Sequence, residues 1–132
     1  MARTIRQTAL IRGATPHDVF ETIMDAKRHS ALVGGQAVRV SRRAGGAFSV
    51  GHDLEGKTLA MTKDRRIVQS WRANNWPQGV YSKATFAFAK APGGTRVTFT
   101  QTGVPSVFYD EIATGWRSYY WGSLRKTFAK AR

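Results

Sequence analysis

The sequence predicts an α+β fold in which a curved antiparallel sheet of six to seven strands wraps around one long C-terminal helix. Three observations predict it. Between Val107 and Phe128, large apolar residues recur every three or four positions, which is the spacing of an amphipathic helix. From Ala37 to Thr102, apolar and polar residues alternate, which is typical of half-buried strands. A short helical region precedes these strands, so we expect the helices to lie on one face of the sheet.

The chain begins with a predicted strand followed by two short helices. Residues 4–11 mix β-branched and polar side chains, as strands do. Thr15, Pro16 and Asp18 indicate a helix start, because threonine caps well, proline fits the first turn and an acid favours the positive end of the helix dipole. A second short helical turn is expected at residues 26–30.

The remaining strands are expected at residues 38–40, 47–50, 54–61, 66–72, 80–89 and 95–102, joined by turns of hairpin length. One of these strands breaks the alternation, because Leu54 is out of phase with Leu59 and Met61. A β-bulge at Gly56 would bring all three side chains onto the same face, and glycine is common at bulges. We therefore predict a bulge at that position.

The C-terminal helix carries an aromatic stripe that cannot remain in water. Its members are Tyr109, Ile112, Trp116, Tyr119, Tyr120, Leu124 and Phe128. Trp121 falls at the edge of this stripe, where it either contacts a partner or packs under a loop. Trp76, in a predicted turn, either gates a cavity or is an exposed packing residue. The simplest way to bury the stripe is to pack it against the concave face of the sheet.

Composition and charge limit the class of protein. The 132 residues predict one domain over positions 1–132, and the lack of cysteine excludes disulfides and thiolate metal sites. The N-terminus contains no apolar run of the length that a signal peptide or membrane span needs, so we expect a cytoplasmic protein without membrane insertion. The net charge of +13 comes from scattered basic residues, which predicts only non-specific association with nucleic acid.

Catalytic chemistry has little support in the sequence. His17, His29 and His52 are far apart and lack the spacing of metal ligands, so no metal or cofactor is expected. The neighbouring His52, Asp53 and Glu55 are the one cluster that resembles acid–base equipment, and a solvated surface turn explains them better. We therefore expect no catalytic residue.

Polar residues on inward faces suggest a binding cavity between the sheet and the helix. Gln69, Ser82 and Gln101 lie on faces that are otherwise apolar, and burying an amide without a partner costs about 1–3 kcal/mol. They indicate a wet cavity or hydrogen bonds to the helix, unless Ser82 and Gln101 reach solvent near the strand ends. The predicted walls are Phe48, Val50, Met61, Trp71, Phe86 and Phe99 from the sheet and Trp116 and Tyr120 from the helix.

Five blocks carry a resemblance to a known family: Gly45-Gly46-Ala47-Phe48, residues 66–72, residues 94–105, Gly115-Trp116 and Tyr119-Tyr120-Trp121. In this order and over nearly the whole chain, they resemble the C-terminal domain of the activator of heat-shock protein 90 ATPase. That family is part of the helix-grip superfamily, also called START-like or SRPBCC and shared with birch-pollen allergens. The resemblance implies a cavity of the kind that binds lipids, sterols or polyketides, and it also implies chaperone partners.

Three functions follow in order of preference. The first is non-enzymatic binding of a small apolar molecule in the cavity between the sheet and the C-terminal helix. The second is a co-chaperone-like protein-interaction module with a chaperone or another protein as partner. The third is a cyclase- or hydrolase-type enzyme that uses a histidine or an acid in the cavity, and it is expected to place His52 inside that cavity. The ligand's identity and the choice between monomer and homodimer stay open.

Overall fold

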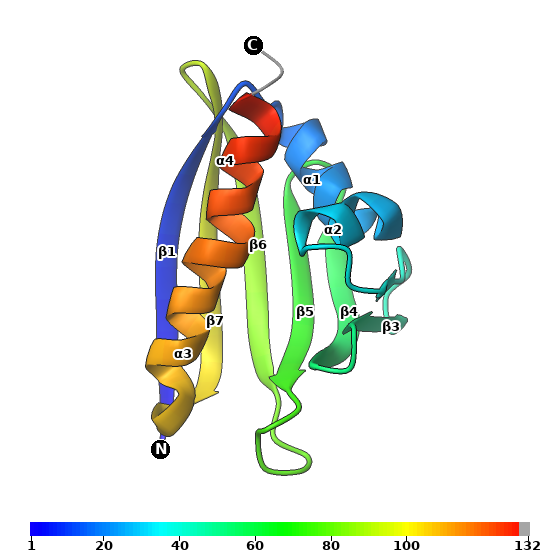
Figure 1. Ribbon diagram of the computed structural model, residues 1–132, viewed down its shortest axis with the longest axis vertical. Helices are drawn as coiled ribbons and strands as arrows, with labels where there is room; N and C mark the ends of the chain where they lie inside the picture. The colour runs from blue at the N-terminus through cyan, green and yellow to red at the C-terminus, as the bar shows by residue number, and fades with distance from the viewer. Residues whose placement is uncertain (130–132) are drawn as a thin grey trace.

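The computed structural model describes residues 1–129 and contains, within them, one antiparallel sheet of seven strands. The strands are β1 (Ala2–Arg12), β2 (Val38–Val40), β3 (Ala47–Val50), β4 (Leu54–Thr62), β5 (Arg66–Ala73), β6 (Ser82–Ala91) and β7 (Gly94–Pro105). Their order across the sheet is β1-β7-β6-β5-β4-β3-β2. Consecutive strands pair as hairpins except that β1 returns to pair with β7, so that the first and last strands lie side by side (Figure 1).

The helices cover one face of this sheet (Figure 1). The first two are α1 (Pro16–Met24) and α2 (Ala26–Leu32), and the C-terminal helix consists of η1 (Ser106–Phe108), α3 (Tyr109–Gly115), η2 (Trp116–Trp121) and α4 (Gly122–Ala129). Thr15 and Asp18 form the predicted cap of α1, since each side chain accepts a hydrogen bond from the other's backbone N–H. This arrangement confirms the predicted α+β, helix-grip fold. No helix within residues 1–129 has the length and apolar character that crossing a membrane requires.

The C-terminal helix is continuous but changes its winding in the middle. Residues 116–121 form a π-helical segment, in which the Gly122 N–H donates to the carbonyl oxygen five residues earlier, that of Arg117. The wider turn brings Trp121 onto the same face as Trp116, whereas a regular helix would turn it away. The expectation that Tyr119 belongs to the buried stripe is therefore wrong, because its side chain is 65% exposed, whereas Trp121 is only 3% exposed.

The predicted bulge at Gly56 is also wrong. The register between β4 and β5 shifts between Thr58 and Ala60, which leaves Leu59 on the solvent face with 42% exposure. Gly56 is instead a point of close approach, because a Cβ atom there would collide with the carbonyl oxygen of Ser70 on β5. The bulge still brings Met61 back toward the face that carries Leu54, and both are partly buried against the core.

The core between the sheet and the helix is built of tightly packed aromatic rings. The Phe99 and Trp116 rings have centroids 4.3 Å apart, and the Trp116 and Trp121 rings stack at 5.8 Å. At one end of this core Trp76 is buried, with its ring against Trp71 at 5.5 Å. Trp76 is therefore neither exposed nor free to move as a gate. A pocket opens at the end of the layer beside Trp71.

Candidate functional site

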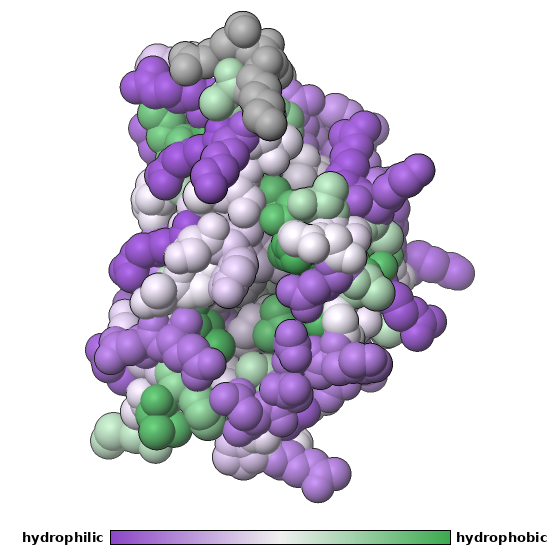
Figure 2. Space-filling model, viewed as in Figure 1, coloured by the Kyte–Doolittle hydropathy of each residue, from purple (hydrophilic) through white to green (hydrophobic). Residues whose placement is uncertain are grey.

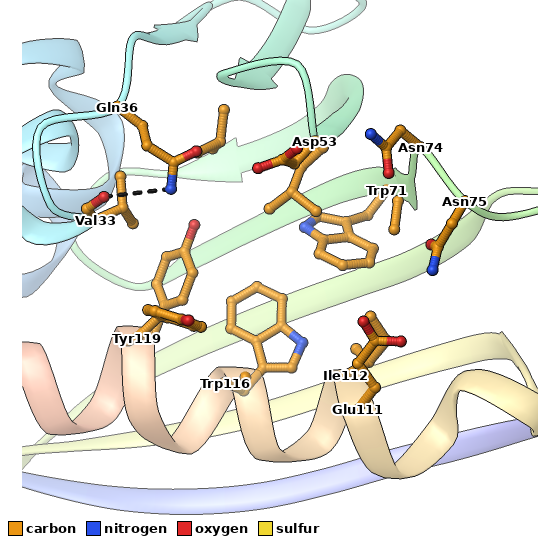
Figure 3. Close-up of a pocket in the computed structure, with 15 residues that line it drawn as sticks. Val33, Gln36, Asp53, Trp71, Asn74, Asn75, Glu111, Ile112, Trp116 and Tyr119 are labelled. Atoms are coloured by element: carbon orange, nitrogen blue, oxygen red, sulfur yellow. Dashed lines mark hydrogen bonds between the residues drawn. The ribbon is translucent and has the colours of Figure 1, made fainter.

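An open pocket of about 380 Å³ lies between the C-terminal helix and the loops at one end of the sheet. Its helix side is formed by α3 and η2, and its other side by the α2–β2 segment, the β3–β4 turn and the end of β5 (Figure 3). Figure 2 shows the corresponding hollow beside the helix, with apolar surface next to it and hydrophilic residues around its rim. This pocket is the candidate site.

The floor of the pocket is aromatic. Trp71 points inward from β5 and Trp116 meets it from η2 (Figure 3), and Tyr120 of η2 also lines the pocket. The ring centroids of Trp71 and Trp116 are 5.7 Å apart, and those of Trp116 and Tyr120 are 4.5 Å apart. Val50 and Ile112 extend this apolar surface toward the ends of the pocket. Such a floor can receive a flat, apolar group.

The mouth of the pocket is polar and contains acids but no base. Its polar side chains are Gln36, Asp53, Asn74, Asn75 and Glu111. The backbone N–H of Asn74 donates to the carbonyl oxygen of Asp53 over 2.8 Å, which ties the β3–β4 turn to the end of β5. The Gln36 amide donates to the Val33 carbonyl oxygen over 3.4 Å. No lysine, arginine or histidine borders the pocket within residues 1–129.

One buried donor in the pocket has no partner. Trp71 is 3% exposed, and its indole Nε1 has no hydrogen-bond acceptor among residues 1–129. An unsatisfied buried donor costs about 1–3 kcal/mol. Trp71 borders the pocket and its indole nitrogen is turned toward it in Figure 3, so an acceptor on a bound molecule would satisfy the N–H once the atoms that cover it move aside.

The structure gathers only part of the predicted site. Four of the predicted residues, Val50, Trp71, Trp116 and Tyr120, line the pocket. The others, Phe48, Met61, Gln69, Ser82, Phe86, Phe99 and Gln101, do not line it. Phe86 and Phe99 belong to the closed aromatic core, with centroids 5.0 Å apart. The sequence did not assign the mouth residues to a pocket, because they lie in separate turns and, for Glu111, on α3, and they come together only in the folded chain.

Two of the predicted polar handles are already used inside the protein. Gln101 accepts a hydrogen bond from Trp116 Nε1 over 2.8 Å and donates to Ser82 Oγ over 2.9 Å. Ser82 in turn donates to the Trp71 carbonyl oxygen over 2.7 Å. Both side chains are buried, so neither reaches solvent. Among the alternatives of a wet cavity, hydrogen bonds to the helix and contact with solvent, Gln101 therefore makes a hydrogen bond to the helix.

His29, considered in the sequence only as a possible metal ligand, is a buried residue with a structural hydrogen-bonding role. Its Nδ1 lies 2.9 Å from the Ile23 carbonyl oxygen and its Nε2 lies 2.8 Å from the Tyr120 hydroxyl. Because a carbonyl can only accept, Nδ1 carries a proton, and because burial disfavours the charged ring, Nε2 has none and accepts from Tyr120. Burial lowers the pKa of His29 and raises that of Tyr120. His29 thus holds the pocket residue Tyr120 in place.

This arrangement predicts a loss of stability in mild acid. Since the folded-state pKa of His29 lies below the unfolded value of about 6.5, the unfolded chain binds the proton more readily. The free energy of unfolding should therefore fall as the pH drops below about 6.5. Urea unfolding between neutral and mildly acidic pH checks this. His29→Gln should flatten the dependence and the exposed control His17→Gln should keep it; parallel curves for the wild type and His29→Gln would contradict the prediction.

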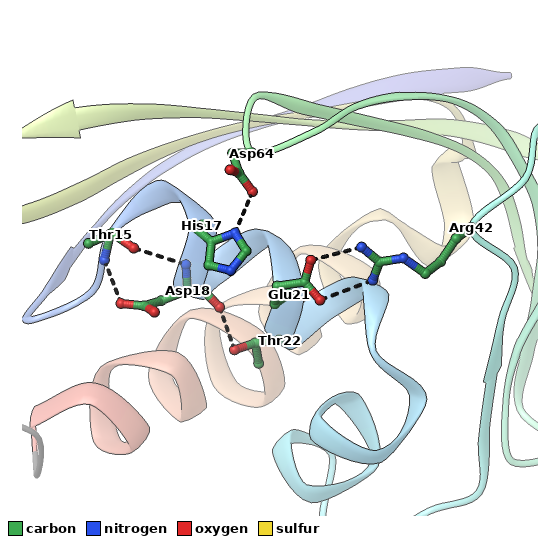
Figure 4. A network of polar contacts seen from close by, with 7 residues as sticks. All are labelled: Thr15, His17, Asp18, Glu21, Thr22, Arg42 and Asp64. Carbon is green, nitrogen blue, oxygen red and sulfur yellow. Dashed lines mark hydrogen bonds and ion pairs between the residues drawn. The ribbon is translucent and has the colours of Figure 1, made fainter.

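The other polar groups are placed as structural contacts rather than as acid–base machinery. His17 at the start of α1 contacts Asp64 of the β4–β5 turn over 2.9 Å, and Glu21 of α1 pairs with Arg42 over 2.8 Å (Figure 4). The hydrogen bond from Arg42 lowers the pKa of Glu21. These contacts fasten α1 to two loops of the sheet.

The residues considered for catalysis or metal binding do not come together. His52 is exposed in its turn, away from the pocket, so the placement expected for the enzyme alternative is not found. Glu55 pairs with Arg72 over 3.1 Å, and Asp53 alone of that cluster lines the pocket. Among residues 1–129, no three histidine, aspartate or glutamate side chains form a group that could hold a metal ion.

Residues 13–129 match the family described as "Activator of Hsp90 ATPase homolog 1-like protein". An uncharacterised Schizosaccharomyces pombe protein is 29% identical over 87% of this chain and 34% of its own length. The human activator of 90 kDa heat shock protein ATPase homolog 1 is 23% identical over 95% of this chain and 36% of its own length. The chain thus spans about a third of these curated relatives. The crystal structure of an HSP90 activator from Plasmodium falciparum has a TM-score of 0.84 at 22% identity, covering 98% of this chain and 96% of that one.

Proposed function

The chain belongs to the family of Activator of Hsp90 ATPase homolog 1-like proteins, and from this premise we propose that it is a non-enzymatic binding protein for a small, largely apolar molecule. The binding site is the pocket between β5 and the C-terminal helix. The observation that carries the proposal is the buried Trp71 Nε1, a donor without a partner that faces a pocket with an aromatic floor. A volume of about 380 Å³ suits a small ligand.

Gly115 gives this proposal independent support. It lies within the C-terminal helix with φ of −58°, a conformation that any residue adopts, yet glycine costs a helix about 1 kcal/mol relative to alanine. An added Cβ atom would come no closer than 3.9 Å to its nearest neighbour, the Tyr119 ring. Neither backbone nor packing requires glycine there, and its missing side chain leaves the pocket open.

Filling the pocket from Gly115 tests the proposal. Gly115→Leu should abolish uptake of the neutral, environment-sensitive dye Nile red, because the new side chain occupies the ligand's space. Its thermal stability should be kept or raised by the gain of about 0.7–1 kcal/mol in helix propensity. The matched control Gly115→Ala should gain similar stability and still take up the dye. Dye uptake by Gly115→Leu equal to that of the wild type would contradict the proposal.

A chaperone-associated role is the second candidate. It is favoured by the human relative, whose name is that of an activator of the 90 kDa heat shock protein ATPase and which matches 95% of this chain. Because the chain spans only about a third of that protein, the partner and the activity are transferred here as a proposal. The test is complex formation with the cognate chaperone and its ATPase rate with and without this chain. An unchanged rate together with no detectable complex would exclude this role.

A further inference from the structure

The charge of the pocket is opposite to that of the protein. The chain has 21 lysine and arginine residues against 8 acids, yet the pocket is bordered by Asp53 and Glu111 and by no base among residues 1–129. Neither carboxylate takes part in an ion pair within those residues. Asp53 comes from the β3–β4 turn and Glu111 from α3, so the two acids face the pocket from opposite sides (Figure 3).

The walls beside these acids also favour a cation. Trp71, Trp116, Tyr119 and Tyr120 all border the pocket. Aromatic faces attract ammonium groups through their quadrupole. Tyr119 projects from the helix at the open side of the pocket, where 65% of its side chain is exposed. A positively charged group would therefore meet acids and aromatic faces together at the mouth.

The unpartnered indole N–H adds a second requirement. Trp71 Nε1 is a donor only, so the ligand must present an acceptor to it. We propose that the pocket selects an amphipathic amine: an apolar ring system on the aromatic floor, an acceptor at Trp71 and a positively charged amine at Asp53 and Glu111. The inference rests on the function proposed above and deepens it by naming the class of ligand.

The obvious alternative predicts the reverse order of affinity. If the net charge of +13 governed binding, an anionic ligand would bind best, since a basic surface attracts anions. If only the apolar floor mattered, a neutral ligand would bind as well as a charged one. Probes that differ only in charge separate these cases.

Three dansyl compounds provide that comparison. Dansylcadaverine carries an amine, N-pentyldansylamide is neutral and 6-(dansylamino)hexanoate carries a carboxylate, while all three share the fluorescent naphthalene ring, the sulfonyl acceptor and a five-carbon chain. We expect dansylcadaverine to bind about tenfold more tightly than 6-(dansylamino)hexanoate, with N-pentyldansylamide between them, as two partly exposed carboxylates and an aromatic wall would give. Added salt should narrow this difference.

Variants of the two acids assign the preference to the pocket. Asp53→Asn and Glu111→Gln should each weaken dansylcadaverine binding by about threefold and leave binding of the neutral N-pentyldansylamide unchanged. The matched control is Asp110→Asn, which makes the same change in charge one position away, at an exposed residue that does not border the pocket. Trp71→Phe should weaken all three probes by a similar factor without changing their order, because the donor and the part of the aromatic floor that it removes are shared by all three.

The outcomes keep the two proposals apart. If the three probes bound equally, or the anionic probe bound best, and Gly115→Leu still abolished their binding, the amine preference would be overturned and the binding function would stand. An effect of Asp110→Asn as large as that of Glu111→Gln would overturn it as well, because general charge would then explain the order. Undiminished binding of all probes by Trp71→Phe would overturn the acceptor requirement. Failure of every dansyl probe and of Nile red to bind the wild-type chain would overturn both proposals.

Discussion

Replacing Trp116 with alanine is expected to lower the free energy of unfolding by about 3–5 kcal/mol, the range for deleting a large aromatic side chain from a core. Trp116 lies at the centre of the aromatic layer, and its ring has four close aromatic neighbours in the described residues besides Trp121. They are Phe99 at 4.3 Å, Tyr120 at 4.5 Å, Phe86 at 5.6 Å and Trp71 at 5.7 Å between centroids. Its indole N–H also donates to Gln101, so the substitution leaves a buried acceptor unpaired.

Chemical denaturation of the wild type and the variant measures this loss directly. Tyr119→Ala is the matched control, because it removes an aromatic ring from the same helical segment but from a position that is 65% exposed. We expect the control to change the free energy of unfolding by about 0.5 kcal/mol or less. A Trp116→Ala variant as stable as the Tyr119→Ala control would show that Trp116 does not anchor the helix.

Much of the fold could be predicted because its signals are local. The capping pattern of Thr15, Pro16 and Asp18 indicates where α1 begins, and hydrogen bonds between neighbouring residues are enough to make that start stable. The alternation through Val97, Phe99 and Gln101 assigns the buried face of β7, and all three side chains are buried. Signals of this kind need no knowledge of the rest of the chain.

The two wrong predictions, a buried Tyr119 and a bulge at Gly56, have a common cause: tertiary packing determines both features. The π-helical segment places Trp116 and Trp121 on one face so that both rings reach the core, and a regular helical period cannot anticipate this change. The bulge near Leu59 depends on how β4 pairs with β5, because Gly56 is already required for close approach to Ser70. Local sequence patterns contain neither fact.

Only part of the candidate site could be predicted, because local patterns identify inward-facing residues but not which distant residues come together. Trp71, Trp116 and Tyr120 could be recognised because strand and helix periods assign them to inward faces. Asp53 and Glu111 lie 58 positions apart in a turn and on a helix, and only the folded chain brings them to one pocket. Gly115 was the available signal in the sequence, since a glycine inside an otherwise strong helical pattern costs the helix about 1 kcal/mol relative to alanine.

The hydrogen-bonded chain through Gln101 predicts a second large effect. Gln101→Met keeps the approximate size of the side chain but removes its bonds to Trp116 Nε1 and to Ser82 Oγ. The Trp116 N–H then remains buried without an acceptor, which costs about 1–3 kcal/mol, and the second lost bond adds about 1 kcal/mol. We therefore expect the free energy of unfolding to fall by about 2–4 kcal/mol in urea denaturation.

Gln69→Met is the matched control for that measurement. Gln69 is as fully buried as Gln101 and lies on the inward face of β5, but its Nε2 has no partner among residues 1–129. Removing an amide whose donor is unsatisfied should cost less than about 1 kcal/mol or even stabilise the protein. Combining Gln101→Met with Ser82→Ala should give a coupling energy of about 0.5–3 kcal/mol, since the two residues share a bond. If Gln101 were instead a free handle for a ligand, Gln101→Met would abolish binding and leave the stability unchanged, and the two residues would show no coupling.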